Sequence, residues 1–339
     1  MPKLPFGRKS RPRVYVTREL PGDALAHLRE HAEAEVWHQD TPPPRAELVR
    51  AVEQIEGLLC LLTDNIDSGV IDAAGSQLRI VSTMAVGYDH IDVDACSRRG
   101  IYVTNTPGVL TETTADFAFA LMLSAARRLS EAERAVREGR WTTWHPSFLA
   151  GQDVGGATLG IVGLGAIGAA VARRARGFDM RVLYCNRTQR SDDEELGVTF
   201  NSFDKLLGES DFVSVHVPLT ADTRHMFNED AFNRMKPGAI FINTARGAVV
   251  DETALLRALE GRRIAGAAID VAEVEPIPKH DMLLRVPNLL VTPHIASASV
   301  ATRQRMARMA VDNLVEALQG NTPANCVNRD ALAGKSGAA

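Results

Sequence analysis

The sequence predicts an α/β protein built from two doubly wound parallel sheets, each covered by helices. Its 339 residues, 45% of them hydrophobic, suffice for two cores in domains of roughly 150 residues each. Short apolar runs alternate with helical segments along most of the chain, as in parallel strands joined by crossover helices. In the second half, a glycine-rich turn separates one such run from an alanine-rich helical segment. These three observations predict the fold class.

The N-terminal third is predicted to form a parallel sheet with helices on both faces. It contains no glycine fingerprint of its own, so we interpret it as the substrate-side domain. The expected strands cover residues 14–17, 34–38, 57–62, 80–84 and 101–104, and the expected helices cover 24–31, 47–55 and 70–74.

A second domain is expected from residue 107 to 298. It opens with a helix at Thr113-x-x-Asp116 that stays apolar on most faces until Arg127, so the helix should be buried against the sheet or against a second subunit. A loop with Trp141 and Trp144 follows. Further strands are expected at residues 158–162, 181–185, 212–217, 239–243, 264–271 and 289–292.

An amphipathic helix is expected from residue 299 to 318, with Gly320 as its C-terminal signal. Because no further strand follows, we expect this helix to return to the first domain, which is then discontinuous (13–106 plus 299–330). The crossovers fall near TPG (106–108) and TPH (292–294), and the active site is expected between the domains. Residues 1–12 and 331–339 are expected to be a disordered arm and tail.

The glycine turn GLGAIG (163–168) is the strongest local motif. Gly163 permits a tight turn, Gly165 lets a diphosphate approach the backbone, and Gly168 lets the helix lie close to the strand. The amides of Ala166 and Ile167 would face the diphosphate at the positive end of the helix. We therefore expect a Rossmann-type cofactor domain inserted in a flavodoxin-like substrate domain. A tight turn that binds nothing is the alternative.

The strand at 181–185 bears on the choice of cofactor. Dinucleotide sites that prefer NAD usually carry an acidic residue at this strand's end, but this chain continues with Asn186, Arg187 and Thr188. A guanidinium and a hydroxyl would bind a 2′-phosphate. We expect NADP(H) to be preferred, with NAD(H) possible. Alternatively, Arg187 and Arg190 belong to an ordinary solvated basic loop.

Composition excludes several other classes. A net charge of −4 argues against a nucleic-acid or anionic-membrane surface as the main partner. The longest apolar stretch, around residues 117–126, is much shorter than the roughly 20 residues of a membrane span. The four cysteines are scattered, which fits neither a disulfide framework nor a zinc site and indicates a reducing cytoplasm. No metal site is expected.

Three residues at expected strand ends could assist the reduction of a 2-oxo acid by a bound dinucleotide. Arg246 can bond the carboxylate and the carbonyl oxygen, His294 can donate a proton, and Glu275 can stabilise the imidazolium. Each has a simpler interpretation, as a surface arginine, a solvated acid or a strand-end histidine whose hydrogen bonds are satisfied. Their joint occurrence beyond a dinucleotide turn favours the catalytic one.

Four segments resemble signatures of the D-isomer-specific 2-hydroxyacid dehydrogenases: GLGAIG (163–168), NTARGAVVD (243–251), DVAEVEP (270–276) and TPHIASAS (292–299). The resemblance covers nearly the whole chain. Within that family, LLCLLTD (58–64), IVSTMAVGYDHID (80–92) and WTTWHP (141–146) resemble the glyoxylate/hydroxypyruvate reductases.

The resemblance implies a catalytic triad of Arg246, Glu275 and His294, with His294 as proton donor. It implies that the amides of Val86 and Gly87 hold the substrate carboxylate and that Asp270 contacts the nicotinamide amide. Further cofactor contacts are expected from Val217, Pro218, Thr244, Ala245, His294 and Ala296.

The resemblance also implies a homodimer with a helical dimerisation arm at about residues 110–150, in which Trp144 reaches the partner's active site, although both tryptophans could instead pack an interface. Two residues depart from the family pattern. Ala272 stands where an aromatic is common, and Ala166 stands where an arginine is common. The second difference removes one expected diphosphate contact.

The expected activity is NADPH-dependent reduction of glyoxylate and hydroxypyruvate to glycolate and D-glycerate. Two alternatives stay open. One is a dehydrogenase of the same kind for a different acid, which reduces 2-oxogluconate or oxidises D-lactate or phosphoglycerate. The other is a dinucleotide-sensing corepressor on the same fold, which the complete triad disfavours.

Overall fold

The computed structural model describes residues 11–333. The chain divides into two compact units: the described residues up to Leu110 together with those from Ser299 onward, and Thr111–Ala298. Most of the predicted disordered arm and tail lies outside the described residues. Two parts of that prediction are wrong. Arg11 donates a hydrogen bond to the carbonyl of Arg29 (2.9 Å), and residues 331–333 belong to a short helix.

The first unit contains a five-stranded parallel sheet in the order β2-β1-β3-β4-β5. This is the flavodoxin-like order that the sequence predicts. The β3 and β4 strands are buried along their whole length, as central strands of a sheet with two covered faces must be. The strands are β1 (Arg13–Val16), β2 (Glu33–Val36), β3 (Gly57–Cys60), β4 (Ile80–Thr83) and β5 (Tyr102–Thr104).

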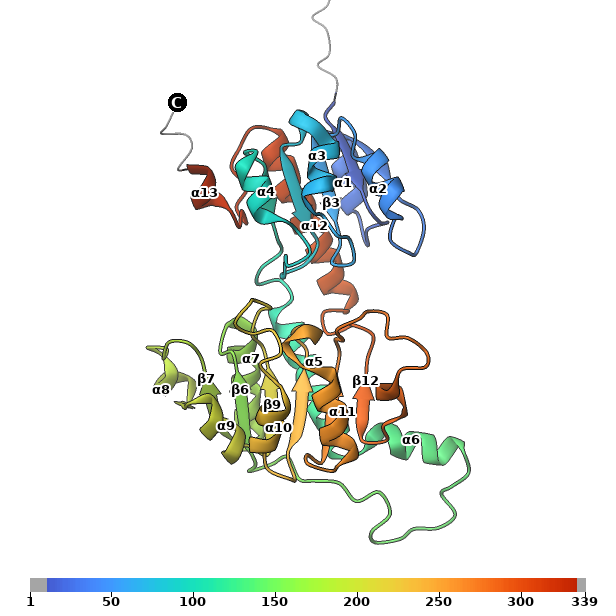
Figure 1. Ribbon diagram of the computed structural model, residues 1–339, viewed down its shortest axis with the longest axis vertical. Coiled ribbons are helices and arrows are strands. Elements are labelled where there is room, and N and C mark those ends of the chain that lie inside the picture. The colour runs from blue at the N-terminus through green and yellow to red at the C-terminus, as the bar shows by residue number, and fades with distance from the viewer. Residues whose placement is uncertain (1–10, 334–339) are drawn as a thin grey trace, which may run out of the picture. The chain divides into compact units, whose positions relative to one another are not determined.

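Helices cover both faces of this sheet (Figure 1). On one face the long helix α12 packs against β3, β4 and β5, and Ser82 donates a hydrogen bond to the carbonyl of Ala310 (2.8 Å). On the other face, apolar side chains of α2, α3 and α4 form one core with the strands. The helices are α1 (Ala24–His31), α2 (Arg45–Ala51), α3 (Ser68–Ala74), α4 (Val93–Arg98), α12 (Val300–Leu318) and α13 (Arg329–Ala333), with a 3-10 turn η1 (Gly75–Gln77).

The second unit contains a seven-stranded parallel sheet in the order β12-β11-β10-β9-β6-β7-β8. The chain begins in the middle at β6, runs outward to β8, and returns to β9 on the other side. This reversal is the switch point of a Rossmann-type sheet. The strands are β6 (Thr158–Val162), β7 (Arg181–Cys185), β8 (Val198–Phe200), β9 (Phe212–Val215), β10 (Ile240–Asn243), β11 (Gly266–Ile269) and β12 (Leu289–Val291).

Two hydrophobic cores lie on opposite faces of the seven-stranded sheet. One is formed with α5 and α7, the other with α9, α10 and α11. Burial on both faces explains why these strands are continuous apolar runs rather than alternating patterns. The helices are α5 (Thr111–Ala126), α6 (Leu129–Arg137), α7 (Ala166–Ala175), α8 (Asp193–Leu196), α9 (Phe203–Glu209), α10 (Glu229–Arg234) and α11 (Glu252–Glu260), with 3-10 turns η2 (Arg176–Phe178), η3 (Gly247–Val249) and η4 (Met282–Arg285).

The segment after α5 differs from the sequence prediction. The α5 helix begins at Thr111 rather than at Thr113, and a further helix, α6, lies between α5 and the predicted loop. Arg128 separates the two helices with φ of 52°, a left-handed conformation that a continuous helix cannot contain. Among the described residues, no helix combines the length and apolarity that crossing a membrane requires.

Candidate active site

The order of the seven-stranded sheet collects most of the predicted site residues at one edge. All its strands are parallel, so the segments that leave β6, β7, β9, β10, β11 and β12 start from the same, carboxyl edge. The glycine turn follows β6, Asn186 follows β7, and Arg246, Asp270 and His294 follow β10, β11 and β12. Residues up to 131 positions apart in the chain, from Gly163 to His294, therefore share this edge.

The turn after β6 has the close packing that its glycines predict. Gly163 has φ of 98°, and a Cβ there would lie 2.8 Å from the backbone carbon of His216. A Cβ at Gly168 would lie 2.3 Å from the carbonyl oxygen of Gly163. Both glycines are thus required sterically, because a methyl group cannot occupy either position without backbone movement.

Gly165 serves a different purpose in the same turn. A Cβ at this position would meet nothing within 4 Å, and both Gly165 and Ala166 are exposed. Gly165 is the N-cap of α7 and offers no side chain to the first helical amides, which include that of Ile167. The turn therefore presents free backbone donors and an open approach at the positive end of a helix, as anion binding requires.

His216, at the end of β9, lies behind the glycine turn and does not act in the same way as His294. Burial lowers the pKa of His216 to about 4, and its Nε2 lies 2.8 Å from the hydroxyl of Ser214. A histidine with this pKa is neutral near pH 7 and cannot serve as a proton donor there. The next residues, Val217 and Pro218, continue along the same edge.

The segment after β7 is tied to the glycine turn. Asn186 accepts a hydrogen bond from the amide of Leu164 (2.6 Å), and Arg190 donates one to the carbonyl of Leu164 (3.1 Å). Arg190 also forms a two-pronged ion pair with Asp192, with N–O distances of 2.6 and 2.5 Å. Arg187 and Thr188 are exposed, and within residues 11–333 neither has a hydrogen-bonding partner.

The Arg246 loop after β10 is shaped by its neighbours. The side chain of Asn243 accepts from the amide of Ala245 (2.9 Å) and donates to the carbonyl of Arg246 (3.0 Å). A Cβ at Gly247 would lie 1.9 Å from the backbone carbon of Ala272. Only glycine therefore allows the loop after β10 to touch the loop after β11, where Glu275 lies.

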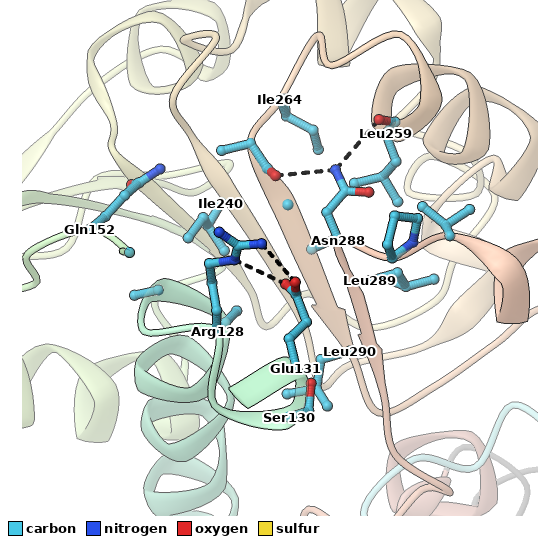
Figure 2. Close-up of a pocket in the computed structure, with 18 of the residues that line it drawn as sticks. Arg128, Ser130, Glu131, Gln152, Ile240, Leu259, Ile264, Asn288, Leu289 and Leu290 are labelled. Carbon is cyan, nitrogen blue, oxygen red and sulfur yellow. Dashed lines mark hydrogen bonds and ion pairs between the residues drawn. The ribbon is translucent and has the colours of Figure 1, made fainter. Parts of the chain in front are cut away.

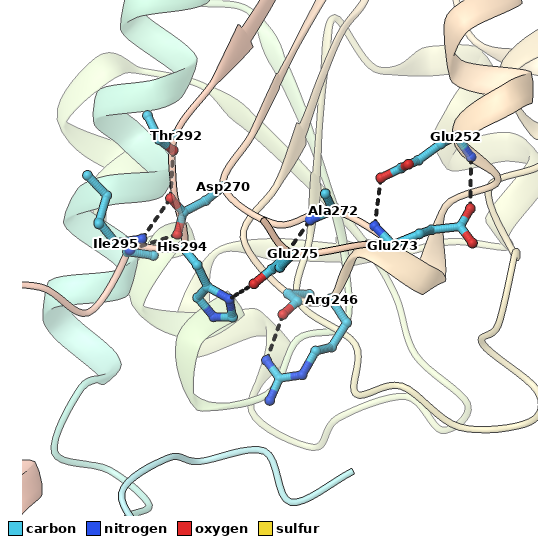
Figure 3. A network of polar contacts seen from close by, with 11 residues as sticks. Arg246, Glu252, Asp270, Ala272, Glu273, Glu275, Thr292, His294 and Ile295 are labelled. Carbon is cyan, nitrogen blue, oxygen red and sulfur yellow. Dashed lines mark hydrogen bonds and ion pairs between the residues drawn. The ribbon is translucent and has the colours of Figure 1, made fainter. Parts of the chain in front are cut away.

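Asp270 organises the segment that carries His294 (Figure 3). Its buried carboxylate accepts hydrogen bonds from the hydroxyl of Thr292 (2.6 Å) and from the amides of Ile295 (2.9 Å) and Ala296 (2.7 Å). Its carbonyl accepts from the amide of His294 (2.8 Å), whose φ is 55°. These bonds hold His294 in a left-handed conformation that is unfavourable for most residues. No pattern in the sequence indicates this positioning role.

Glu275 and His294 form a direct pair. The Nδ1 atom of His294 lies 2.7 Å from Oε2 of Glu275, whose other oxygen accepts from the amide of Ala272 (3.0 Å). Burial raises the pKa of Glu275, but the bond with His294, with help from the charge of Arg246, outweighs burial and leaves this pKa below its ordinary value. Glu275 is therefore ionised near pH 7. The side chains of His294 and Glu275 are 23% and 30% exposed, so the pair can be reached from outside.

The carboxyl edge fits a nicotinamide dinucleotide. The buried hydroxyl of Thr244, just after β10, has no hydrogen-bonding partner in the described part of the chain. Such a group usually has a partner that the protein itself does not supply. Together with the open approach at Gly165, this orphaned hydroxyl indicates a polar ligand along the edge.

The predicted substrate residues outside this edge lie in two places. Val86 and Gly87 follow β4 at the carboxyl edge of the five-stranded sheet, where Asn105 donates a hydrogen bond to the carbonyl of Val86 (2.8 Å). Trp144 lies in the segment after α6 and is 78% exposed.

A large pocket of the second unit lies away from these residues (Figure 2). Its volume is about 610 Å³, and its lining includes the first residues of β10, β11 and β12 and the ion pair of Arg128 with Glu131 (2.7 Å). The pocket is therefore at the amino edge of the sheet, opposite to the His294 pair. Its position makes it a poor candidate for the reaction.

Comparisons with known proteins show which family the chain belongs to. The family model described as D-isomer specific 2-hydroxyacid dehydrogenase, NAD binding domain, matches residues 119–296 of this chain. A glyoxylate reductase of Korarchaeum cryptofilum (strain OPF8) is 54% identical over 324 residues, which are 95% of this chain and 97% of the relative.

Solved structures are similar over nearly the whole chain. A protein from Thermus thermophilus has a TM-score of 0.88 and 48% identity, covering 93% of this chain and 99% of its own. An NADPH-dependent glyoxylate/hydroxypyruvate reductase from Sinorhizobium meliloti, in complex with NADP and malonate, has a TM-score of 0.83 and 36% identity, covering 94% and 97%. The chain thus belongs to the D-isomer specific 2-hydroxyacid dehydrogenase family and is an NAD(P)-dependent oxidoreductase that acts on small 2-oxo or 2-hydroxy acids.

Proposed function

We propose that this enzyme reduces glyoxylate and hydroxypyruvate to glycolate and D-glycerate, with NADPH as the preferred reductant. The observation that carries the proposal is the convergence of Arg246, Glu275 and His294 at the ends of three adjacent strands, with 2.7 Å between His294 and Glu275. The bound reduced nicotinamide dinucleotide supplies a hydride to the carbonyl carbon. All other tasks fall to side chains and amides of this chain.

His294 is the proposed proton donor. Its Nδ1 faces Glu275, which leaves Nε2 for the substrate oxygen. The ionised carboxylate holds the ring through Nδ1, so Nε2 is oriented to donate the proton that the developing alkoxide takes up. When the proton leaves, the imidazole stays fixed by the same carboxylate and can be protonated again from solvent.

Arg246 is the proposed substrate clamp. A guanidinium can donate to the carboxylate and to the carbonyl oxygen of a 2-oxo acid together, and its charge stabilises the developing alkoxide. Figure 3 shows its side chain beside Glu275, from the loop that Gly247 allows to approach. The amides of Val86 and Gly87 are proposed to hold the same carboxylate.

The names of relatives support the choice of substrate. The Korarchaeum cryptofilum relative is a glyoxylate reductase, and the Sinorhizobium meliloti neighbour is a glyoxylate/hydroxypyruvate reductase. Enzymes for other D-2-hydroxy acids share this fold, so the decisive experiment is a substrate panel. We expect glyoxylate and hydroxypyruvate to give kcat/KM at least about tenfold above pyruvate and 2-oxogluconate, which requires about 1.4 kcal/mol of discrimination. Higher activity with either of the latter would overturn the proposed substrates.

The proposed preference for NADPH rests on Arg187 and Thr188, which are exposed after β7 where no acidic residue stands. Arg190 is the weaker candidate for binding the 2′-phosphate because its guanidinium is already paired with Asp192. Asn186 lies at the same strand end. We propose further cofactor contacts from both sides of the turn and from the later strand ends: Gly163, Gly165, Ala166, Ile167, Gly168, Val217, Pro218, Thr244, Ala245, Asp270, His294 and Ala296.

The preference is tested by comparing NADPH and NADH with the wild-type enzyme and with Arg187→Ala. Loss of one charge-assisted contact should raise KM for NADPH by about tenfold and leave KM for NADH unchanged. Arg190→Ala is the matched variant and should change the ratio less. A wild-type preference for NADH would contradict the proposal.

We also propose a homodimer. The segment from α6 to residue 148 exposes large apolar side chains, which are unfavourable in water unless a partner covers them. They are Leu129, Val136, Trp141, Trp144 and Phe148. Size measurement in solution tests the dimer. Trp144→Ala tests the proposed contact with the partner's active site, because unchanged kinetics on every substrate would argue against that contact.

A further inference from the structure

We propose that His27, Glu30 and His31 form a binding site for one divalent transition-metal ion on the first unit, unrelated to the reducing chemistry. The three residues belong to α1 (Ala24–His31) and carry the spacing His-x-x-Glu-His. Cysteine spacing predicts no metal site in this chain, and the histidine spacing is a separate signal. Residues at i, i+3 and i+4 lie on one face of a helix, so the three ligand groups point to the same side.

The distances suit a small ion. One ligand atom from each of the three residues can be chosen so that all lie within 4.8 Å of one another. Nδ1 of His27 is 3.7 Å from Oε2 of Glu30, and the two imidazole rings are 5.1 Å apart and nearly perpendicular, at 74°. Tetrahedral zinc with bonds of about 2.1 Å keeps its ligand atoms about 3.4 Å apart. Small side-chain rotations would therefore complete the site.

Asp312 of α12 supplies the support that metal-binding histidines usually have. Its Oδ1 lies 3.2 Å from Nε2 of His27, on the opposite side of the ring from Glu30. A carboxylate there accepts the Nε2 proton and leaves the Nδ1 lone pair for the ion. Asp312 is itself held by Arg308, whose Nε donates to Oδ1 (2.9 Å).

The local charge also permits a cation. Arg308 is the positive group beside Asp312, and it also lies 3.6 Å from the carboxylate of Asp23. The three carboxylates of Asp23, Glu30 and Asp312 thus carry more negative charge than Arg308 carries positive charge. The helices α1 and α12 pack against each other, so an ion on His27 would connect them through Asp312 and stabilise the folded unit when bound.

A simple histidine–acid pair is the alternative explanation, and the chain contains one for comparison. Nδ1 of His38 lies 2.6 Å from Glu19, and no third ligand group joins them among the described residues. His38 is therefore the matched control. His294, paired with Glu275, is a second control because a zinc ion could also bind at the active site.

The test is a calorimetric titration of the chelator-treated full-length protein with zinc chloride. Thermal unfolding is measured in parallel. We expect one ion per chain and an increase in the unfolding temperature. His31→Ala should weaken the affinity at least about tenfold, and Asp312→Asn should weaken it by about tenfold, as loss of an outer-shell partner does. His38→Ala and His294→Gln should bind as the wild type does.

Each result decides the proposal. If His31→Ala binds zinc like the wild type, or if His294→Gln abolishes binding, the ion is elsewhere and the proposal is wrong. An equal loss in His38→Ala would also overturn it. Unfolding temperatures of His31→Ala and His31→Gln measured in chelator show whether either substitution damages the helix. A variant that keeps the wild-type unfolding temperature in chelator but binds zinc more weakly has lost a ligand. Catalytic activity is not needed as a readout, so failure here leaves the proposed reaction untouched.

Discussion

The two edges of the seven-stranded sheet are built from the same strands and have different properties. At the carboxyl edge, the segments after β10, β11 and β12 bring Arg246, Asp270 and His294 together, and hydrogen bonds from Asn243 and Asp270 shape these segments. At the amino edge, the starts of the same strands line an open pocket of about 610 Å³. Strand direction, rather than pocket size, therefore places the chemistry.

The difference has a physical cause. In a parallel sheet the segments leaving the strands all begin at one edge, where they can carry side chains toward a shared ligand. The segments that enter β7, β10, β11 and β12 follow helices or 3-10 turns directly and are short, as at Gly238 and Asn288. If this explanation is correct, substitutions of Arg246, Glu275 and His294 should affect catalysis, and matched substitutions of similar residues outside this set should not.

The largest effect is expected from His294→Gln. Removing the proton donor should lower kcat by about 10³-fold, within the range of general acid catalysis, and leave cofactor affinity unchanged. Steady-state kinetics and cofactor titration measure the two quantities. The control is His225→Gln, because His225 also pairs with a glutamate, Glu273, at 3.1 Å. Wild-type turnover in His294→Gln would refute the proposed role, and an equal loss in both variants would show that any histidine pair matters.

Arg246→Ala should produce the next largest effect. Loss of a two-pronged clamp on the substrate carboxylate and carbonyl should lower kcat/KM for 2-oxo acids by about 10²-fold, or about 2.7 kcal/mol. Most of this loss should appear in KM for the 2-oxo acid. Arg257→Ala is the matched control, since Arg257 is an exposed arginine of α11, 3.5 Å from Glu229. A normal KM for glyoxylate in Arg246→Ala would contradict the clamp.

Gly247→Ala tests whether the approach of two loops creates the carboxyl edge. Its Cβ would lie 1.9 Å from the backbone of Ala272, so the loops carrying Arg246 and Glu275 must separate. We expect a loss of stability of about 2 kcal/mol, which is typical of overpacking, together with reduced activity. Gly238→Ala is the control at the amino edge, where a Cβ meets nothing within 4 Å. Urea unfolding of both variants measures the difference, and equal midpoints would mean that the contact is unimportant.

Much of the fold could be predicted from local patterns. The spans of α1, β6 and β7 agree with the expected ranges because the apolar residues of each have the spacing that a helix or a buried strand requires. The β8 strand was not predicted, since three residues with an exposed Thr199 at the centre give no period that differs from a loop. The α6 helix lies within the arm that the family resemblance implies, but its bounds were not predicted, because its exposed, charged surface resembles a solvated segment.

The residues proposed to contact the substrate could be predicted from the sequence. The residues that position them could not. Arg246, Glu275 and His294 stand out in the sequence because their chemistry is recognisable after apolar runs. The roles of Asn243 and Asp270 depend on hydrogen bonds to residues that only the strand order brings near. Gly247 likewise looks like an ordinary turn glycine until the Ala272 loop is placed against it.

Glu275→Gln should have the smallest effect and the most specific one. Glutamine keeps an acceptor for Nδ1 of His294 but removes the negative charge that faces the ring during proton transfer, so kcat should fall by about tenfold. Steady-state kinetics measures this change, and His225→Gln again serves as the control. Wild-type kcat in Glu275→Gln would contradict a role for the charge.

Stability gives an independent check on the same pair. The pKa of Glu275 lies below its ordinary value in the folded enzyme, so its ionised form stabilises the fold at pH above the unfolded value of about 4.3. That contribution is lost as pH falls through the folded pKa. The difference in unfolding temperature between wild type and Glu275→Gln should therefore be greatest near pH 7 and shrink toward pH 3. A difference that is constant over this range would mean that the charge on Glu275 does not stabilise the fold. The contact with His294 would then contribute only through packing and an uncharged hydrogen bond.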